Sequence, residues 1–411
     1  MRVLLLTQII PYPPDAGPKV KTWHVLRYLA DCGHEITLLS FVRPEEEAYV
    51  DHLRQICHQV HTVPIRRSRL HDVGYWLRSH ITGRPFLIER DDLPQMRSYI
   101  RQLLAAEKFD VIHADQLTMT QFALGAEGEK RPFLIFDAHN AVWTITERMG
   151  ESAPWFLKPV LRLESQRIKR YEGMLVEQFD HTMVVIEPDR RALLAGVRDG
   201  STESLRHRIT VIPIAVDTRQ LYPIHRQPPS ARIVTLGTLH YPPNADGIRW
   251  FLREVLPLVR QQIPDATLTI IGKNPPKDFL EAAGQYPEVV TVTGYVPDLK
   301  PYMEQSSIMV VPVRAGGGMR VRILEAFARA MPVVTTTVGL EGIEATDGKE
   351  VLVADDPAAY AAATVQLLRN EELQNRLSAN GRLLATTIYD WQIVLKKMDQ
   401  IYAQATEQTL Q

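Results

Sequence analysis

The residues with the clearest chemical potential lie in a glycine loop between two apolar stretches. The loop consists of Gly316, Gly317 and Gly318, and it follows residues 308–313, whose apolar and β-branched side chains predict a buried parallel strand. Apolar residues from Met319 to Ala330 are then spaced for a helix. The free N–H groups and the positive dipole end of a helix N-terminus suit a phosphate, so this loop is a candidate anion site.

Three charged residues follow the loop. A cation at a helix N-terminus opposes the helix dipole, so Arg320 is an odd local choice unless an anion binds there. We take Arg320 as the candidate diphosphate clamp because a guanidinium can bind phosphate through two hydrogen bonds. Arg322 is the weaker candidate, since its side chain points in another direction around the helix. Glu325 is the candidate ribose ligand, because a carboxylate can accept two hydroxyls. The alternative is a tight loop with solvated arginines and an exposed carboxylate.

The elements that must position these residues alternate between strands and helices along the chain. This pattern predicts an α/β fold with two doubly wound, Rossmann-like parallel-sheet domains that face each other across a crevice. We expect a first domain at 1–217, a linker rich in proline at 218–230, a second domain at 231–390 and a C-terminal helix at 391–411 that can cross back to the first domain.

The expected helices include several long ones. In the first half we expect helices at 44–61, 92–107, 155–178 and 188–196, and in the second half at 244–260, 276–284, 298–305, 357–369, 371–385 and 391–406. The expected strands run through 2–8, 35–41, 63–65, 109–113, 134–140, 182–186, 209–213, 233–237, 267–271, 289–293, 308–313, 333–336 and 350–353. Ligands of such sheets bind at the carboxyl ends of the strands, where the loop with Gly17, the loop Gly316–Gly318 and His139 fall.

Composition excludes several function classes. The chain has 411 residues and a formal net charge of -1, which gives no electrostatic case for nucleic acid. Cys32 and Cys57 are the only cysteines and form no metal motif, so we expect reduced thiols and a cytoplasmic protein. No apolar run approaches the ~18 residues of a membrane span, and the apolar start of the chain ends at prolines without a cleavage site.

Other motifs support simpler roles. No GxGxxG follows the first strand, which argues against a dinucleotide-binding oxidoreductase. No cluster has convincing zinc or calcium spacing, so we expect no metal, and Asp355–Asp356 before Pro357 favours a helix cap. We expect His113 to be structural. The basic, aromatic stretch 66–85 is either a peripheral membrane contact that can hold a lipid phosphate, or a solvated helix with extended arginines.

The order of these features resembles the GT-B glycosyltransferases of family four over nearly the whole chain. The resemblance rests on the loop at 13–17, the helix-to-strand segment 29–36, the interdomain stretch 212–217, the loop 294–296 and, most specifically, residues 324–334. Within the group, residues 241–246 and 316–320 resemble a bacterial subgroup linked to exopolysaccharide systems.

The resemblance implies a site in residues from both halves. Catalytic roles would fall to His139, which would contact the transferred sugar or the acceptor, and to Arg320 and Glu325. Substrate contacts would come from Gly17, Gly237, Tyr295, Val296, Gly316, Gly317, Gly318 and Met319. The chain departs from the family pattern in two places. Gly317 occupies the position at which the family usually has the first glutamate of its motif, and the loop after Gly237 lacks the usual basic pair.

The implied function is transfer of a hexose-type sugar from a nucleotide diphosphate sugar to a glycan or lipid-linked acceptor, with retention of stereochemistry and without metal or other cofactor. Such chemistry depends on positioning and on stabilising the charge of the leaving diphosphate. The alternatives are a GT-B nucleotide-sugar epimerase or hydrolase, and a non-catalytic nucleotide-sugar-binding protein.

Overall fold

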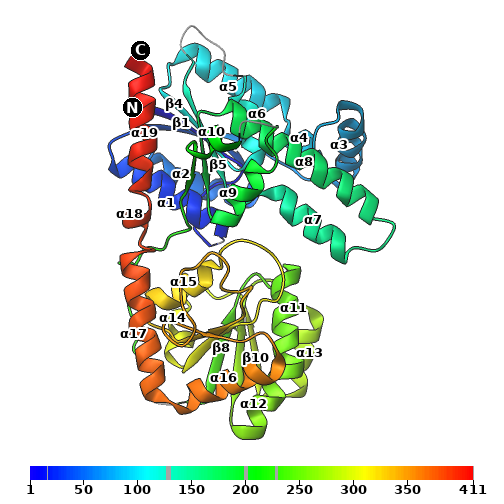
Figure 1. Ribbon diagram of the computed structural model, residues 1–411, viewed down its shortest axis with the longest axis vertical. Helices are drawn as coiled ribbons and strands as arrows, with labels where there is room; N and C mark the ends of the chain where they lie inside the picture. The colour runs from blue at the N-terminus through cyan, green and yellow to red at the C-terminus, as the bar shows by residue number, and fades with distance from the viewer. Residues whose placement is uncertain (16, 126–130, 199–201, 227–229, 411) are drawn as a thin grey trace. The chain divides into compact units, whose positions relative to one another are not determined.

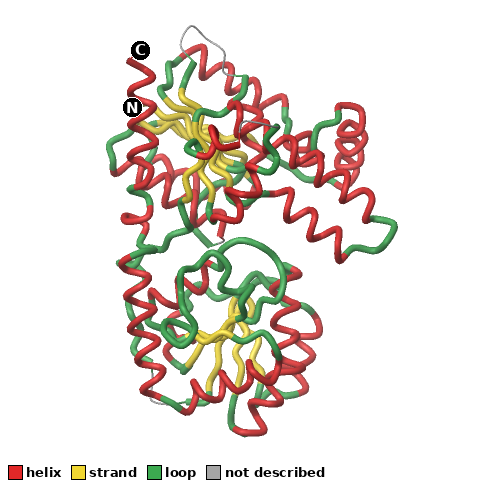
Figure 2. The backbone as a smooth tube through the Cα atoms, viewed as in Figure 1, coloured by secondary structure: helices red, strands yellow, loops and turns green. Residues whose placement is uncertain are grey.

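The computed structural model describes residues 1–15, 17–125, 131–198, 202–226 and 230–410. It divides into two compact units. Unit 1 contains Met1–Pro213 and Val394–Gln411, and unit 2 contains Ile214–Ile393. In each unit the strands form a central sheet with helices on both of its faces (Figure 2).

The sheet of unit 1 is parallel throughout, with the strand order β3-β2-β1-β4-β5-β6-β7. Figure 1 labels β1, β4 and β5 of this sheet. Its strands are β1 (Arg2–Thr7), β2 (Glu35–Val42), β3 (Gln59–Pro64), β4 (Val111–Asp115), β5 (Phe133–Ala138), β6 (His181–Val184) and β7 (Ile209–Val211). Strands β1, β4 and β5 are almost wholly buried and mostly apolar, as expected for a sheet covered on both faces. The order reverses between β1 and β4, which is where such sheets bind ligands.

Helices and short turns cover this sheet. They are α1 (Gly17–Asp31), α2 (Val50–Arg54), α3 (Arg69–Thr82), α4 (Phe86–Asp91), α5 (Pro94–Ala106), α6 (Thr120–Ala123), α7 (Val142–Ser152), α8 (Lys158–Gln178), α9 (Glu187–Leu194), α10 (Thr202–Arg206), α19 (Lys397–Leu410) and the 3-10 turns Pro44–Tyr49 and Leu117–Met119. The core between the sheet and its helices includes Leu4, Phe41, Ile112, Phe136 and Ile168.

Unit 2 repeats the plan with the strand order β10-β9-β8-β11-β12-β13, again parallel. Its strands are β8 (Arg232–Leu236), β9 (Thr267–Ile271), β10 (Val290–Gly294), β11 (Ile308–Val311), β12 (Val333–Thr335) and β13 (Leu352–Val353). Its helices are α11 (Pro242–Trp250), the π-helical turn Phe251–Val255, α12 (Leu256–Gln262), α13 (Lys277–Gln285), α14 (Lys300–Glu304), α15 (Val321–Ala328), α16 (Pro357–Arg369) and α17 (Glu371–Thr387), and α18 (Trp391–Val394) ends across the unit boundary. The predicted α/β class with two Rossmann-like parallel sheets is thus confirmed.

Asp356 caps α16 as predicted, because its Oδ1 accepts from the amide of Ala359 at 2.9 Å. Its neighbour Asp355 accepts from the amide of Thr337 instead. The predicted capping role of this acidic pair is therefore confirmed for Asp356.

Several predicted helices were wrong in extent. Residues 44–61 form a 3-10 turn, a short helix and then β3, which pairs with the edge of β2 from Thr37 opposite Gln59 to Val42 opposite Pro64. The β-branched residues of 59–64 suit this edge position better than a helix. The predicted helix 155–178 is α8 alone, preceded by a separate α7 that ends just before Pro154. The predicted helix 244–260 is interrupted by the π-helical turn, since Pro257 has no N–H for the helical ladder.

The C-terminal segment is also divided. The predicted helix 391–406 is broken between Val394 and Lys397, and α19 belongs to unit 1. Tyr402 of α19 lies with its hydroxyl 2.9 Å from Nδ1 of His113, and Asp399 accepts a hydrogen bond from Tyr28 at 2.7 Å.

The segment predicted as a linker begins with ordered contacts inside unit 2. The amide of Val216 donates to the carbonyl of Tyr389 at 2.9 Å, and Arg226 donates to Gln374 at 2.8 Å. Residues 227–229 of the predicted linker lie outside the described residues.

Candidate active site

In unit 2 the glycine loop follows the carboxyl end of β11. Gly316 and Gly318 adopt φ angles of 104° and 82°, which glycine tolerates and other residues rarely do. Helix α15 begins at Val321, so Met319 and Arg320 precede it, and Arg320 is the N-cap residue rather than a residue of the helix. The glycines set this later start, because they turn the chain before helical geometry can begin.

The guanidinium of Arg320 folds back on the loop. Its Nη1 donates to the carbonyls of Gly317 and Gly318 at 2.7 and 2.6 Å. The loop conformation and the position of this charge therefore depend on each other. The side chain is half-buried beside the N-terminus of α15, where a positive charge repels the dipole and attracts an anion.

Arg322 occupies the place that the sequence left without a cation. Its Nη1 donates to the carbonyl of Leu236 and its Nη2 to Oδ1 of Asn244, both at 2.8 Å. A Cβ at Gly237 would overlap Nη1 of Arg322, so the missing side chain at 237 is what admits the guanidinium. Burial and the charge of Arg320 lower the pKa of Arg322 to about 10, so it remains charged at neutral pH. The structure thus puts a cation at the loop after β8, although the residues of that loop, 238–241, include no Arg or Lys.

Glu325 lies one helical turn beyond Arg322 on α15 and is half-buried. Burial raises the pKa of its carboxyl, and the charges of Arg329 and Arg322 oppose that rise. A half-buried carboxylate next to a cation is suited to accept hydroxyl groups.

Other predicted contacts lie at neighbouring strand ends. Gly237 follows β8, and Tyr295 and Val296 follow β10, with Tyr295 59% exposed. Nζ of Lys273, which follows β9, lies 4.5 Å from the centre of the Tyr295 ring. Lys273 was not among the predicted site residues, although its place two residues after a strand was the available signal.

In unit 1 two acidic side chains lie at the carboxyl ends of neighbouring strands. Asp115 of β4 and Asp137 of β5 pair in register, and both are buried. Two adjacent buried carboxylates repel each other unless cations or donors neutralise them. Lys21 of α1 supplies a cation in an ion pair with Asp137, and Thr22 donates to Asp115 at 3.1 Å. Burial works against ionisation of Asp137, but Lys21 and the hydrogen bond from His113 hold its pKa well below the usual range.

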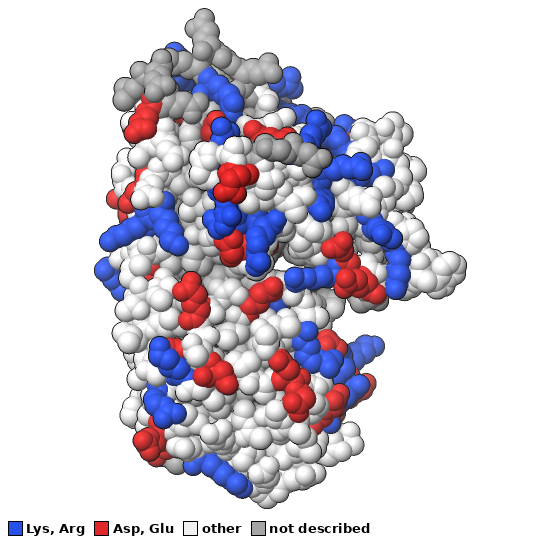
Figure 3. Space-filling model, in the orientation of Figure 1, with Lys and Arg blue, Asp and Glu red and all other residues white. Residues whose placement is uncertain are grey.

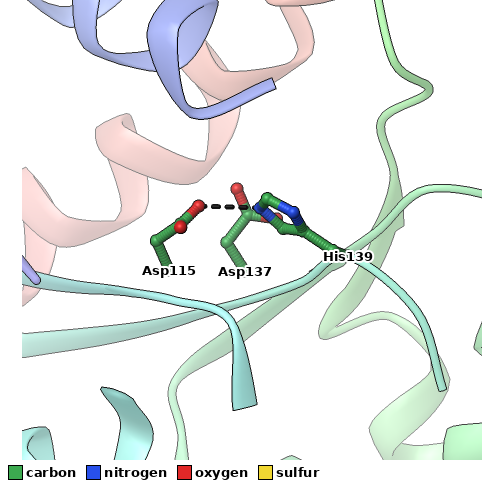
Figure 4. Close-up of side chains that lie close together, drawn as sticks. All are labelled: Asp115, Asp137 and His139. Carbon is green, nitrogen blue, oxygen red and sulfur yellow. Dashed lines mark hydrogen bonds and ion pairs between the residues drawn. The ribbon is translucent and has the colours of Figure 1, made fainter. Parts of the chain in front are cut away.

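His139 follows β5 and completes this group. Its Nε2 lies 2.8 Å from Oδ1 of Asp115 (Figure 4). A carboxylate there accepts the Nε2 proton, which assigns the neutral ring to the tautomer with a lone pair on Nδ1. Such a ring can accept a hydrogen bond from a sugar hydroxyl. Gly17, another predicted contact residue, is the first residue of α1 and follows the loop after β1.

The same three side chains have the ligand types of a metal site. One ligand atom each from Asp115, Asp137 and His139 lies within 4.8 Å of the others. An ion would have to displace the ammonium of Lys21 from Asp137 and the imidazole N–H from Asp115. Oδ1 of Asp137 and Oδ1 of Asp115 therefore already pair within the protein, and the group does not fit a divalent ion as arranged.

His113 takes a structural place, as expected. It is fully buried, its Nδ1 meets the hydroxyl of Tyr402 at 2.9 Å, and its Nε2 lies 3.5 Å from Asp137. It joins β4 to α19.

Comparison with known families accounts for both units. Residues 17–220 match the model described as "Glycosyltransferase Family 4", and residues 230–370 match "Glycosyl transferases group 1". The chain belongs to the glycosyltransferases that these two models describe. The predicted recognition and the predicted class of enzyme are confirmed at this level.

Two curated relatives of this glycosyltransferase differ in how much of the chain they match. The chain is 21% identical to an uncharacterised 44.6 kDa protein in the cps region of Klebsiella pneumoniae, across 95% of this chain and 96% of that one. It is 30% identical to a phosphatidyl-myo-inositol mannosyltransferase of Mycobacterium leprae over 37% of this chain and 41% of the relative.

Solved structures confirm the GT-B fold. A sucrose-phosphate synthase from Thermosynechococcus elongatus superposes with a TM-score of 0.74 at 16% identity, covering 99% of this chain and all of that one. Anabaena HepE, solved in complex with UDP, gives a TM-score of 0.69 at 13% identity, covering 98% of this chain and all of that one.

Proposed function

We propose that this glycosyltransferase moves a hexose-type sugar from a nucleoside diphosphate sugar to a glycan or lipid-linked acceptor of a bacterial polysaccharide or cell-envelope pathway. The observation that carries the proposal is the arrangement of residues at the start of α15 in unit 2, which suits an anion. There the glycine loop, two guanidiniums and Glu325 gather around the start of α15. The relative in a cps region and the HepE complex with UDP support the pathway and the donor class.

Each group then has a task. Glu325 accepts the ribose hydroxyls, and Tyr295 and Val296 lie where a base can pack. As the sugar bond breaks, the leaving diphosphate gains negative charge, and Arg320, Arg322 and the amides at the start of α15 stabilise it. His139 accepts a hydrogen bond from the transferred sugar or the acceptor through Nδ1. Retention of stereochemistry and independence of metal are parts of the same proposal.

The alternatives have less support. An epimerase or hydrolase needs an acid or base carboxylate at the reacting sugar, and a binding protein needs none of the transfer machinery. Both matching family models describe transferases, so a transferase is favoured.

The test is a donor screen. The protein is incubated with UDP-, GDP- and ADP-hexoses without acceptor, while melting temperature and free nucleoside diphosphate are followed. A transferase site is expected to be stabilised by one nucleoside diphosphate and to release it slowly from the matching sugar donor. Tight binding with no release from any donor, or release with an isomerised sugar, would overturn the proposal.

No helix among the described residues is long and apolar enough to cross a membrane. We propose that the enzyme works in the cytoplasm at the inner face of the membrane, where a lipid-linked acceptor would be presented to it.

A further inference from the structure

Helix α3 turns its apolar side to solvent. Leu70 and Ile81 are 84% and 87% exposed, and Val73 and Leu77 between them are more than half exposed. Spacings of three and four residues put these four side chains on one face of the helix. Ser79, on the opposite side, is fully buried. A helix packed for burial of apolar surface would have the reverse arrangement.

Polar contacts hold α3 in this orientation. Ser79 donates to the carbonyl of Arg84 at 2.6 Å and accepts from Arg167 of α8 at 3.3 Å. Arg78 pairs with the buried carboxylate of Glu89 on α4 at 2.8 Å. The outward apolar face therefore takes no part in fixing the helix to unit 1.

A second apolar group lies at the turn between α7 and α8, which form a hairpin that extends from the sheet of unit 1 (Figure 1). Trp155 is 83% exposed and Phe156 59%, and their rings meet edge to face at 6.1 Å. Glu164 of α8 accepts from the amide of Phe86 at 2.6 Å, which ties this hairpin to the segment that follows α3. We call Leu70, Val73, Leu77, Ile81, Trp155 and Phe156 the apolar patch.

The surroundings of the apolar patch are basic. Residues 66–84 contain five Arg and one Asp, and residues 142–170 contain six Lys or Arg and three Glu, in a chain whose net charge is -1. Part of this charge is matched inside the protein, since Arg67 and Arg84 pair with Asp91 and Glu89. Arg66, Lys158 and Arg162 are exposed. Lys and Arg side chains spread over the face of unit 1 where α3, α4 and α8 lie (Figure 3).

We propose that the apolar patch and its basic border dock unit 1 on an anionic lipid bilayer. Exposed leucine, isoleucine and tryptophan can enter the boundary between headgroups and acyl chains, and the cations can meet lipid phosphates. Helix α3 has 14 residues, so it is about 21 Å long and lies on the bilayer rather than across it. The inference deepens the proposed function, because a lipid-linked acceptor would be met at this surface.

The experiment is sedimentation of the full chain with vesicles of phosphatidylcholine alone and of phosphatidylcholine with phosphatidylglycerol. Parent protein is expected to partition at least tenfold more strongly to the anionic vesicles, and less at high salt. Two double variants, Leu70→Glu/Ile81→Glu and Trp155→Ser/Phe156→Ser, are each expected to lose roughly tenfold or more of the binding. Leu280→Glu, at a residue of α13 in unit 2 that is 51% exposed, is the control and should bind as the parent does.

Unchanged vesicle binding in both double variants, or equal binding to neutral and anionic vesicles, would overturn the proposal. So would a dimer in sedimentation equilibrium that both double variants dissociate, because the apolar patch would then be an interface between two copies. Release of nucleotide from the donor without vesicles is measured in parallel. Its absence in the parent would refute the proposed function and leave the vesicle result standing.

Discussion

His139 and Asp115 are joined by a 2.8 Å contact between Nε2 and Oδ1, at the ends of two neighbouring strands. Asp115 is itself held by Thr22, so the ring orientation of His139 is set by α1 and β4 as well as by its own strand. The contact fixes which nitrogen is left for substrate.

Replacement of His139 should therefore affect turnover and spare nucleotide binding. We expect His139→Ala to lower kcat by about tenfold or more, the scale of about 1.4 kcal/mol or more for a hydrogen bond lost in the transition state, with nucleotide affinity near that of the parent. Asp115→Asn should lower kcat less, since an amide oxygen can still accept the Nε2 proton. Steady-state kinetics and calorimetry make the comparison, and full turnover in His139→Ala would remove this residue from the site.

Glu325 should act on binding. We expect Glu325→Ala to weaken the nucleoside diphosphate by about 1.5–3 kcal/mol, the range for hydrogen bonds to a charged group. Titration calorimetry measures it, with Glu281→Ala on the exposed side of α13 as the matched control. Equal affinities in Glu325→Ala and the parent would show that the carboxylate does not meet the ribose.

The two arginines near the glycine loop should discriminate between phosphates. Arg320→Ala is expected to weaken diphosphate more than monophosphate, to leave the free nucleoside nearly unchanged and to lower turnover, with Arg320→Lys recovering only part. We expect the same order for Arg322→Gln, because its guanidinium lies at Gly237. Arg314→Ala, an exposed residue paired with Asp246 at 3.0 Å, is the control. Uniform losses for nucleoside, monophosphate and diphosphate would mean that an arginine only supports the fold.

We expect the folded protein to lose stability in acid because of His181. Burial lowers its pKa to about 4, the charge of His207 acts in the same direction, and a hydrogen bond from the ring to Gln404 opposes them. From its ordinary value of 6.5 down to about 4 the unfolded chain binds a proton that the folded chain does not, so stability is present above pH 6.5 and is lost as pH falls. The loss amounts to about 3 kcal/mol.

The measurement is urea unfolding between pH 7 and pH 4. His181→Gln should lose less stability over this range than the parent, and His58→Gln, at an exposed position, should follow the parent. A His181→Gln curve parallel to that of the parent would assign the acid sensitivity to other groups.

Activity should persist in chelator. Because Lys21 already pairs with Asp137, we expect turnover in EDTA to stay within about twofold of that in magnesium, since arginines and a helix N-terminus can carry the phosphate charge. Activity that disappears in EDTA and returns with magnesium or manganese would refute this.

The strand-end loops were predictable because a parallel sheet brings all of them to one edge. Gly316–Gly318 follow from that rule, whereas Gly237 and Tyr295 were named from the resemblance to a known family. The place of Arg322 was not predictable. It depends on space left by a glycine far away in sequence and on a helix that starts at Val321, two residues after Met319.

The orientation of α3 was the other feature that could not be predicted from the sequence. The pattern of 69–82 indicates an amphipathic helix but not which side faces the protein, because the carboxylates that hold α3 from its polar side lie on a later helix. The pairing of Asp115 with Asp137 could not be predicted either, because it depends on the register between two strands that are separate in sequence.

Helix α19 has a consequence for the order in which the chain can fold. The ribosome releases residues 214–393 before the residues that supply Tyr402 and Asp399 to unit 1. Domains fold as units during synthesis, usually the N-terminal one first. In this chain all residues of unit 2 are synthesised before unit 1 is complete. Until α19 emerges, His113 of unit 1 lacks the hydroxyl of Tyr402 as its partner.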